Sequence, residues 1–399
     1  MITLSQGSSG GQPDKQCAEL RWLDVSPASM FNGTTLGVPW PQGMYRPRQS
    51  FVLHNDKGAE IPLQTWALAY WPDGSLKWTA HAIACGGEMT AAMRLSPGES
   101  EGPLPRIIIS ETADTIEVDT GTMKCRIGRA GKVVIRSIER NGRVLAQDGE
   151  LVCLRQDRAE APEDGNIRQE RSIGFIEKAV VEQAGPLRAA VCLQGTHKSG
   201  GARAWLPFVL RLYFYWGGNT IRVMHTFIYD GDEHKDFVRG IGLRFAVPMH
   251  DQLHDRHIRF TGQDNGLWAE AVRGLTGLRR DPGQTTREAQ VAGMPAPSVE
   301  EMDPRVANRL KLIPAWGDFT LSQLSADGFQ IRKRTKPGHG WIAAGAGKRA
   351  SGAGYVGGVS GGMAFGIRHF WQKHPSQLDI RGAASDKAEV TMWLWSPDA

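Results

Sequence analysis

Regular alternation of apolar and polar residues is the feature that most constrains how this chain folds. Leu212 and Phe214 fall on one face of an extended segment, and Arg211, Tyr213 and Tyr215 fall on the other. Successive side chains of a strand point to opposite faces, so this pattern predicts a β-strand. Other long strand segments are residues 187–195, 205–216, 220–229 and 237–247. Long alternating strands of this kind predict an all-β chain whose main part is a large antiparallel β-sandwich.

Turn and linker signals divide the 399 residues into two β units. Residues 1–18 are polar and rich in glycine and serine, which predicts a disordered lead-in. Short apolar runs alternate with turns over residues 19–97 and predict a small first unit, with a hairpin turn at residues 72–75. A proline- and glycine-rich linker at residues 96–103 leads to the second unit, residues 104–399.

An irregular insertion interrupts the second unit at residues 251–315, where charged and loop-forming residues dominate. A connection this long between strands is a candidate rim or lid of a binding site. Within it, residues 299–312 predict a short helix that Pro304 interrupts. Strand signals then resume at residues 319–324, 329–333, 341–344, 363–371 and 390–395.

Composition excludes several classes of protein. The net charge of +5 is modest and spread along the chain, and it favours an acidic ligand slightly over a neutral one. The five cysteines are scattered, without metal-ligand spacing, which predicts reduced thiols and a cytoplasmic protein. The sequence shows no secretory leader. If a leader was removed beforehand, a periplasmic or secreted location is the alternative. No apolar stretch is long enough to span a membrane, so no membrane partner is expected.

A basic segment near the C-terminal end offers the groups that an acidic sugar needs. It contains Arg332, Lys333, Arg334, Lys336, His339 and Trp341. Cations bind a carboxylate, an imidazole transfers a proton, and an indole stacks on a sugar ring. Phosphate groups would attract similar cations, but no nucleic-acid-binding motif accompanies them, so no nucleic-acid partner is expected. A solvated basic hairpin is the alternative.

A second candidate segment contains His225, Phe227 and Tyr229, which share one face if the strand continues to Tyr229. A histidine and a tyrosine side by side would serve as base and acid. A histidine buried in the sandwich is the competing interpretation. The carboxylates that follow are Asp230, Asp232, Glu233 and Asp236. We predict no metal and no cofactor, and Ca²⁺ bound by these carboxylates is the alternative.

Several further motifs favour structural roles. Trp371 lies in an aromatic segment that is expected to end a strand, and it is either a core residue or a platform for a sugar. Trp71, Asp73 and Trp78 are expected to shape a turn in the first unit. Residues 352–362 fit GxGxxG and GxSxG by letter. Both motifs need a following helix, whereas a strand candidate follows here.

Several motifs in this order resemble the exo-rhamnogalacturonan-lyase-like (YetA-like) family. They are Val38-Pro39-Trp40-Pro41-Gln42-Gly43, Pro62-Leu63-Gln64, Trp71 to Trp78, His225-Thr226-Phe227 with Asp230-Gly231-Asp232, Lys336 to Trp341, and Phe370 to Pro375. The resemblance implies a RIFT-type β-barrel over residues 19–97 and a central, supersandwich-like β-sandwich over residues 104–399. It also implies a C-terminal α/α toroid, which we expect this sequence to lack and a separate polypeptide to supply as a partner.

The resemblance implies a polysaccharide lyase that cleaves a uronic-acid-containing polysaccharide, such as rhamnogalacturonan, by β-elimination. This chemistry requires a cation at the carboxylate, a base for the proton on C5 and an acid for the departing O4. We assign the proton transfers to His339, His225 and Tyr229. The expected substrate-binding residues are Arg332, Arg334, Lys336, Trp341 and Trp371. A non-catalytic fragment that binds acidic glycans and a mutarotase-like sugar epimerase are the alternatives.

Overall fold

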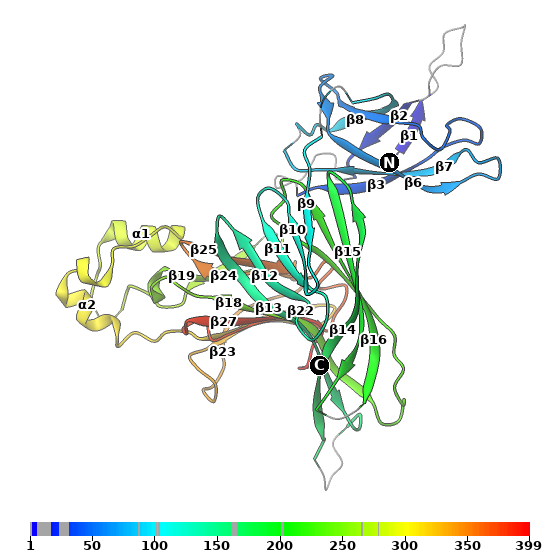
Figure 1. The fold of residues 1–399 in the computed structure, drawn as a ribbon. Helices are drawn as coiled ribbons and strands as arrows, with labels where there is room; N and C mark the ends of the chain where they lie inside the picture. The colour runs from blue at the N-terminus through cyan, green and yellow to red at the C-terminus, as the bar shows by residue number, and fades with distance from the viewer. Residues whose placement is uncertain are drawn as a thin grey trace. The chain divides into compact units, whose positions relative to one another are not determined.

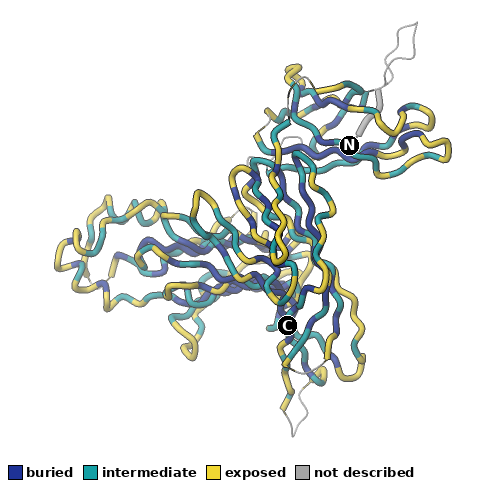
Figure 2. Tube along the Cα trace, in the orientation of Figure 1, coloured by how far each residue is buried: buried dark blue, intermediate teal, exposed yellow. Residues whose placement is uncertain are grey.

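The chain folds almost entirely into β-strands (Figure 1). The computed structural model describes all residues except 1, 6–16, 24–31, 87, 101, 103, 161–165, 201–202, 265 and 278. Contacts divide the chain into two units. The first comprises Met1–Arg126, Ala179–Leu193 and Val209–Thr226, and the second comprises Ile127–Lys178, Gln194–Phe208 and Phe227–Ala399. In both units the buried residues follow the strands, as Figure 2 shows.

Two small sheets form the N-terminal part of the first unit. One has the order β1 (Ile2–Ser5), β2 (Cys17–Arg21), β8 (Ala92–Pro97), β4 (Phe51–Asn55) and β5 (Glu60–Ile61), and the other has the order β3 (Thr34–Pro39), β7 (Leu76–Ile83) and β6 (Leu63–Tyr70). Apolar side chains from both sheets share one core, in which the ring of Trp40 stacks on Phe51 at 5.1 Å. This is the small first β unit that the sequence predicted.

The predicted hairpin turn at residues 72–75 joins β6 to β7. The Asp73 carboxylate accepts hydrogen bonds from the backbone N–H of Ser75 at 3.0 Å and from its hydroxyl at 2.6 Å. Gly74 has φ +82°, a conformation that favours glycine. Asp73 therefore shapes the turn, as expected.

The start of the chain differs from the predicted lead-in of residues 1–18. Ile2–Ser5 form a strand that pairs antiparallel with Cys17–Arg21. The two strands pair over four residues, from Ile2 with Leu20 to Ser5 with Cys17. Residues 6–16 lie outside the described residues. Strand β8 extends to Pro97, so the first residues of the linker predicted at residues 96–103 belong to a strand.

One large antiparallel sheet dominates the rest of the chain. Its main order is β17 (Arg222–Phe227), β16 (Ala204–Tyr215), β15 (Arg188–Lys198), β14 (Gln169–Ala184), β13 (Arg143–Gln156), β18 (Phe237–Pro248), β27 (Lys387–Trp395), β26 (Ser376–Arg381), β21 (Asp318–Ser325), β22 (Gly328–Arg334) and β23 (Ile342–Gly347). Four strands continue it beside β13, namely β9 (Ile108–Glu111), β10 (Thr115–Asp119), β11 (Lys124–Gly128) and β12 (Ile135–Arg140). Leu212 and Phe214 are fully buried while Arg211 and Tyr213 are half-buried, which confirms the predicted alternation as far as residue 214; Tyr215, predicted on the more exposed face, is buried.

The insertion at residues 251–315 is more regular than predicted. It contributes β19 (Arg256–Thr261) and β20 (Leu267–Ala271), which join β24 (Ala353–Gly358) and β25 (Gly361–Gly366) in a four-stranded sheet. Helices α1 (Gln284–Ala292) and α2 (Pro304–Leu310) follow, drawn in yellow in Figure 1. Pro304 begins α2 rather than interrupting a helix, because the first helical position needs no backbone N–H.

Other local features bear on the sequence predictions. The glycine-rich residues that fit GxGxxG lie mostly within β24, so they form a strand and not a phosphate-binding loop. All five cysteines are free, and Cys125, Cys153 and Cys192 are buried. In the described residues, no helix is both apolar and long enough to cross a membrane.

Candidate functional site

The hairpin of β22 and β23 separates the predicted sugar-binding residues into two places. The chain pairs Phe329 with Gly347 at one end and Lys333 with Ile342 at the other. A strand rises about 3.3 Å per residue, so the ends of this hairpin lie roughly 15–20 Å apart. The turn at residues 335–341 closes the far end, whereas Asp327 and Lys348 flank the near end. The predicted basic segment thus lies at one end and Trp371 near the other.

A hollow of about 780 Å³ lies at the near end, and we call it the Trp371 hollow. It is lined by Gln263, Asp264, Asp327, Lys348, Arg349, Ser351, His369, Phe370, Trp371 and Gln372. These residues come from four turns or loops that are distant in sequence. A concave space with a few convergent polar groups is the usual form of a small-ligand site.

Arg349 and Trp371 form the central pair of the hollow. The guanidinium carbon of Arg349 lies 4.4 Å from the centroid of the Trp371 ring. Arg349 Nε also donates to Asp327 Oδ1 at 2.9 Å. Both partners of this ion pair are about half exposed, so the pair is weak and a ligand carboxylate can replace Asp327. The ring keeps the guanidinium in place during such an exchange.

A buried glutamine fixes the turn that carries Lys348 and Arg349. Gln323 is fully buried; its Nε2 donates to the carbonyl of Lys348 at 2.8 Å, and its Oε1 accepts from the backbone N–H of Ala350 at 3.0 Å. Ser351 donates its hydroxyl to the carbonyl of Gly262 at 3.0 Å. The backbone beneath the two cations is therefore held by the second unit's own sheet.

His369 completes the hollow and was missed by the sequence analysis, which predicted a strand through residues 363–371. Strand β25 ends at Gly366 instead, and His369 adopts φ +60° in the turn that follows. Phe370 is buried beneath it, and a Cβ added to Gly352 would lie 2.1 Å from Phe370 Cβ, so only glycine fits there. A positive φ is uncommon for histidine, and such outliers cluster at functional sites. The adjacent Lys348-Arg349 and His369-Phe370-Trp371 were the available sequence signals.

At the far end of the hairpin, Trp341 is surrounded by three guanidinium groups. Its ring centroid lies 4.4 Å from Arg334, 5.1 Å from Arg381 and 5.5 Å from Arg332. Each guanidinium also faces a carboxylate. The ion pairs are Arg334–Asp318 at 2.7 Å, Arg381–Asp379 at 2.8 Å and Arg332–Asp398 at 2.8 Å. We call these seven residues the Trp341 cluster.

The Trp341 cluster changes how the basic segment is interpreted. Asp318 is buried, so its bond to Arg334 is strong, and displacing Arg334 would leave a buried charge unpaired. Arg334 therefore holds the hairpin in place, which differs from its expected role as a free carboxylate ligand. His339 and Lys336 lie in the exposed turn, where His339 Nδ1 is 2.7 Å from the Thr335 hydroxyl. Neither residue lines the Trp371 hollow.

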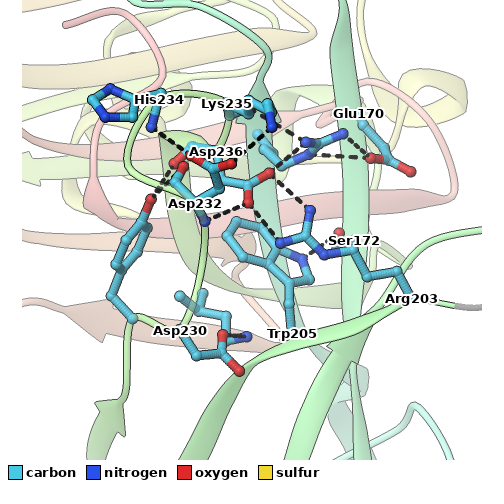
Figure 3. Close-up of polar contacts among 12 residues, drawn as sticks. Glu170, Ser172, Arg203, Trp205, Asp230, Asp232, His234, Lys235 and Asp236 are labelled. Atoms are coloured by element: carbon cyan, nitrogen blue, oxygen red, sulfur yellow. Dashed lines mark hydrogen bonds and ion pairs between the residues drawn. The ribbon is translucent and has the colours of Figure 1, made fainter.

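Asp236 is the centre of a separate polar network (Figure 3). Arg203 binds both of its carboxylate oxygens, at 2.8 and 2.6 Å, and Arg155 binds Oδ1 at 2.6 Å. The backbone N–H of Asp232 adds a bond to Oδ2 at 2.8 Å. The Arg203 guanidinium, followed by this N–H and Arg155, holds the pKa of Asp236 well below its usual value. Because every contact is internal, the network fixes the loop before β18.

Tyr229 belongs to this loop and not to a strand shared with His225. Strand β17 ends at Phe227, because the chain turns at the acidic residues that follow. The Tyr229 hydroxyl donates to the carbonyl of Asp236 at 2.8 Å, and burial, with the nearby Asp236 charge, raises the pKa of Tyr229. His225 lies half-buried within β17. The expected pairing of His225 and Tyr229 on one strand face is therefore wrong.

The acidic residues of this loop are engaged by the chain itself. Asp230 Oδ1 accepts the backbone N–H of Leu206 at 2.7 Å, and Asp232 Oδ1 accepts that of His234 at 2.9 Å. In the part of the chain that the structure describes, no three His, Cys, Asp or Glu side chains come together as a metal site.

The fold and its hollow define an all-β protein with an N-terminal barrel and a large sandwich. Residues 16–98 match the PcRGLX-like N-terminal RIFT barrel domain, and residues 107–399 match the PcRGLX-like protein central beta sandwich domain. The chain is 35% identical over 383 residues to the uncharacterized protein YetA of Bacillus subtilis (strain 168). The chain belongs to the PcRGLX-like family, which is related to rhamnogalacturonan lyases, and the expected resemblance is confirmed. The match covers 95% of this chain but 44% of YetA, so the chain spans less than half the length of that relative.

Proposed function

We propose that this chain is the barrel and sandwich part of a polysaccharide lyase that cleaves a uronic-acid-containing glycan, such as rhamnogalacturonan, by β-elimination. The Trp371 hollow is the observation that carries the proposal. It brings an indole, two cations and an imidazole into one space of about 780 Å³. Relatedness to rhamnogalacturonan lyases supports the same substrate class.

The chemistry assigns one task to each group of the hollow. Arg349 and Lys348 bind the sugar carboxylate and neutralise it, which makes the proton on C5 more acidic. His369 accepts that proton while the C4–O4 bond breaks and a C4–C5 double bond forms. The departing O4 takes a proton from an acid, which is a second histidine or water in this proposal. Trp371 contacts the apolar face of the ring.

The balance of charge in the hollow limits what it binds. Lys348 and Arg349 face Asp264 and Asp327, so the ionised side chains of the lining sum to zero. A glycan carboxylate therefore binds by replacing Asp327 on Arg349 rather than by filling an empty cationic site. We expect binding of moderate strength that depends on ionic strength.

The test is the ultraviolet absorbance of the unsaturated uronate when the protein is incubated with pectic polysaccharides. We expect activity in this chain or in this chain combined with the part of YetA that it does not match. Arg349→Ala should lower kcat/KM at least tenfold, because a charge-assisted hydrogen bond contributes about 1.5–3 kcal/mol. Arg349→Lys should restore part of it.

His369→Gly is the variant that isolates the imidazole, since glycine adopts φ +60° without strain. We expect turnover to disappear while the free energy of unfolding is kept or increased. His339→Ala is the parallel variant for the exposed turn. Loss of turnover in His339→Ala with full activity in His369→Gly would move the site to the basic segment.

A non-catalytic role in binding acidic glycans is the second candidate. The observation that favours it is the pairing of Arg349 with the Trp371 ring, which suits the binding of an acidic sugar whether or not a proton is transferred. Binding to uronic polysaccharide without new absorbance, in this chain and in a full-length relative, would support that role over the lyase.

A further inference from the structure

A second hollow lies in the first unit, lined by residues of β4, β6 and β7 and of adjoining loops, and it belongs to none of the groups described so far. Its volume is about 410 Å³, within the usual range for small-ligand sites. Its floor includes the apolar side chains of Phe51, Leu63 and Leu76, and its rim includes Arg48 and Glu99. Thr65 also lines it, and we call it the Thr65 hollow.

A chain of hydrogen bonds runs from the barrel core to Thr65. Trp40 Nε1 donates to the Thr79 hydroxyl at 2.7 Å, and this hydroxyl lies 2.7 Å from His81 Nε2. The other ring nitrogen, His81 Nδ1, lies 2.9 Å from the Thr65 hydroxyl. His81 and Thr79 are buried, so water does not complete their hydrogen bonding.

The direction of each bond follows from counting donors. Thr79 already accepts from Trp40, so its own hydrogen needs an acceptor, and His81 Nε2 is the partner that the described residues provide. The reverse arrangement would leave the buried Thr79 hydrogen without an acceptor, at a cost of about 1–3 kcal/mol. His81 therefore carries its proton on Nδ1 and donates to Thr65. The Thr65 hydroxyl hydrogen is then left to point into the hollow.

From this geometry we infer that the Thr65 hollow binds a neutral sugar residue, with the Thr65 hydroxyl donating to a ligand oxygen. The apolar floor suits the face of a pyranose ring, and the oppositely charged Arg48 and Glu99 suit its hydroxyl groups. One cation and one anion on the rim give no preference for a carboxylate. The site lies within the first unit, so it is independent of the Trp371 hollow and of the proposed elimination.

The experiment is an NMR titration of the full chain with methyl α-L-rhamnopyranoside and methyl β-D-galactopyranoside, with sodium D-galacturonate as the acidic counterpart. The nitrogen resonances of the His81 ring report on the hollow and on the tautomer. We expect a protonated Nδ1 and a saturable shift with a neutral glycoside, and weaker binding of galacturonate. Absence of any shift with both neutral glycosides, or a protonated Nε2, overturns the inference.

Variants identify the hydroxyl. Thr65→Val keeps the shape of threonine without the donor, and we expect about tenfold weaker binding. Thr65→Ser should bind within about twofold of the native chain. Arg48 is an exposed residue of the lining, so Arg48→Ala should weaken binding even if Thr65→Val does not fold. Arg349→Ala should leave this binding unchanged. Equal binding in the native chain, Thr65→Val and Arg48→Ala rejects the site.

Discussion

Arginine side chains of the second unit fall into two groups according to the burial of the carboxylate that each one faces. Arg334 faces Asp318, and Arg203 faces Asp236, and both carboxylates are buried. Arg349 faces the exposed Asp327. Arginines of the first group hold the fold, because displacing them leaves a charge unpaired inside the protein. An arginine of the second group exchanges partners at little cost and is suited to a ligand.

Asp236→Ala tests the first group. We expect the free energy of unfolding to fall by about 3–5 kcal/mol, since Arg155 and Arg203 lose a shared buried partner. Urea unfolding measures the change. Glu170→Gln is the matched control, because Glu170 also binds Arg155 but is partly exposed, and we expect a loss below about 1 kcal/mol. Equal losses in the two variants would contradict the distinction.

Asp236 also affects how the free energy of unfolding depends on pH in the acid range. The folded-state pKa of Asp236 lies below its unfolded value near 4, so its contribution is complete above that pH and is lost as the pH falls below it. We therefore expect Asp236→Asn to be less stable than the native chain at pH 7 but to lose less further stability between pH 4 and pH 2. A constant difference between the two proteins over this range would argue against it.

His81 also makes the protein less stable as the pH falls, although it is the neutral form of this residue, and not a charged form as for Asp236, that the folded chain favours. Burial lowers its pKa from 6.5 to about 4, so the unfolded chain binds a proton that the folded chain excludes. Stability from the neutral ring is complete above pH 6.5 and declines toward pH 4. We expect about 2 kcal/mol less stability at pH 5 than at pH 7 from this residue. The difference between the native chain and His81→Gln, followed by urea unfolding, isolates it; a ring that titrates near 6.5 would refute it.

At the scale of elements, the β22–β23 hairpin carries different chemistry at its two ends. Its far turn presents Lys336 and His339 to solvent, and the Trp341 cluster anchors that end to the sheet. Its near end contributes Asp327, Lys348 and Arg349 to the Trp371 hollow. Changes that loosen one end are therefore expected to alter the position of the other.

Trp341→Ala tests the anchor. Loss of a half-buried indole and of its contacts with three guanidiniums should lower local stability by about 2 kcal/mol and speed amide hydrogen exchange in β22 and β23. Trp341→Phe keeps an aromatic face and should lose less than half as much. Unchanged exchange together with loss of glycan binding would restore the stacking role that the sequence suggested.

The sequence predicted elements better than it predicted the site. Alternation identified strands such as β16 and β18, because one face of each is buried. It missed β14, whose second half is half-buried at best and contains Glu, Lys and Ala, residues that favour helices. The sequence could not predict the Trp371 hollow for a different reason. Its lining comes from four separate turns or loops, and only the sheet register brings Asp327, Arg349 and His369 together.

At the scale of the molecule, the charge pattern separates the two hollows. The Trp371 hollow is proposed to bind an anion by exchange at Arg349, whereas the Thr65 hollow is proposed to bind a neutral residue. A branched acidic glycan offers both kinds of residue, so it contains a ligand for each hollow.

Ionic strength provides the final prediction. The chain carries a net charge of +5, so its binding to polygalacturonate should weaken markedly between 0.05 and about 0.5 M NaCl as the screening length shortens. Binding of a neutral galactan, through the Thr65 hollow, should change less than about twofold over the same range. Isothermal calorimetry measures both, with Arg349→Ala and Thr65→Val as reciprocal controls. Each variant should reduce binding of one polymer and spare the other. Equal, salt-sensitive binding of polygalacturonate by the native chain and by Arg349→Ala would mean that a diffuse positive surface, and not the Trp371 hollow, accounts for binding of the acidic polymer.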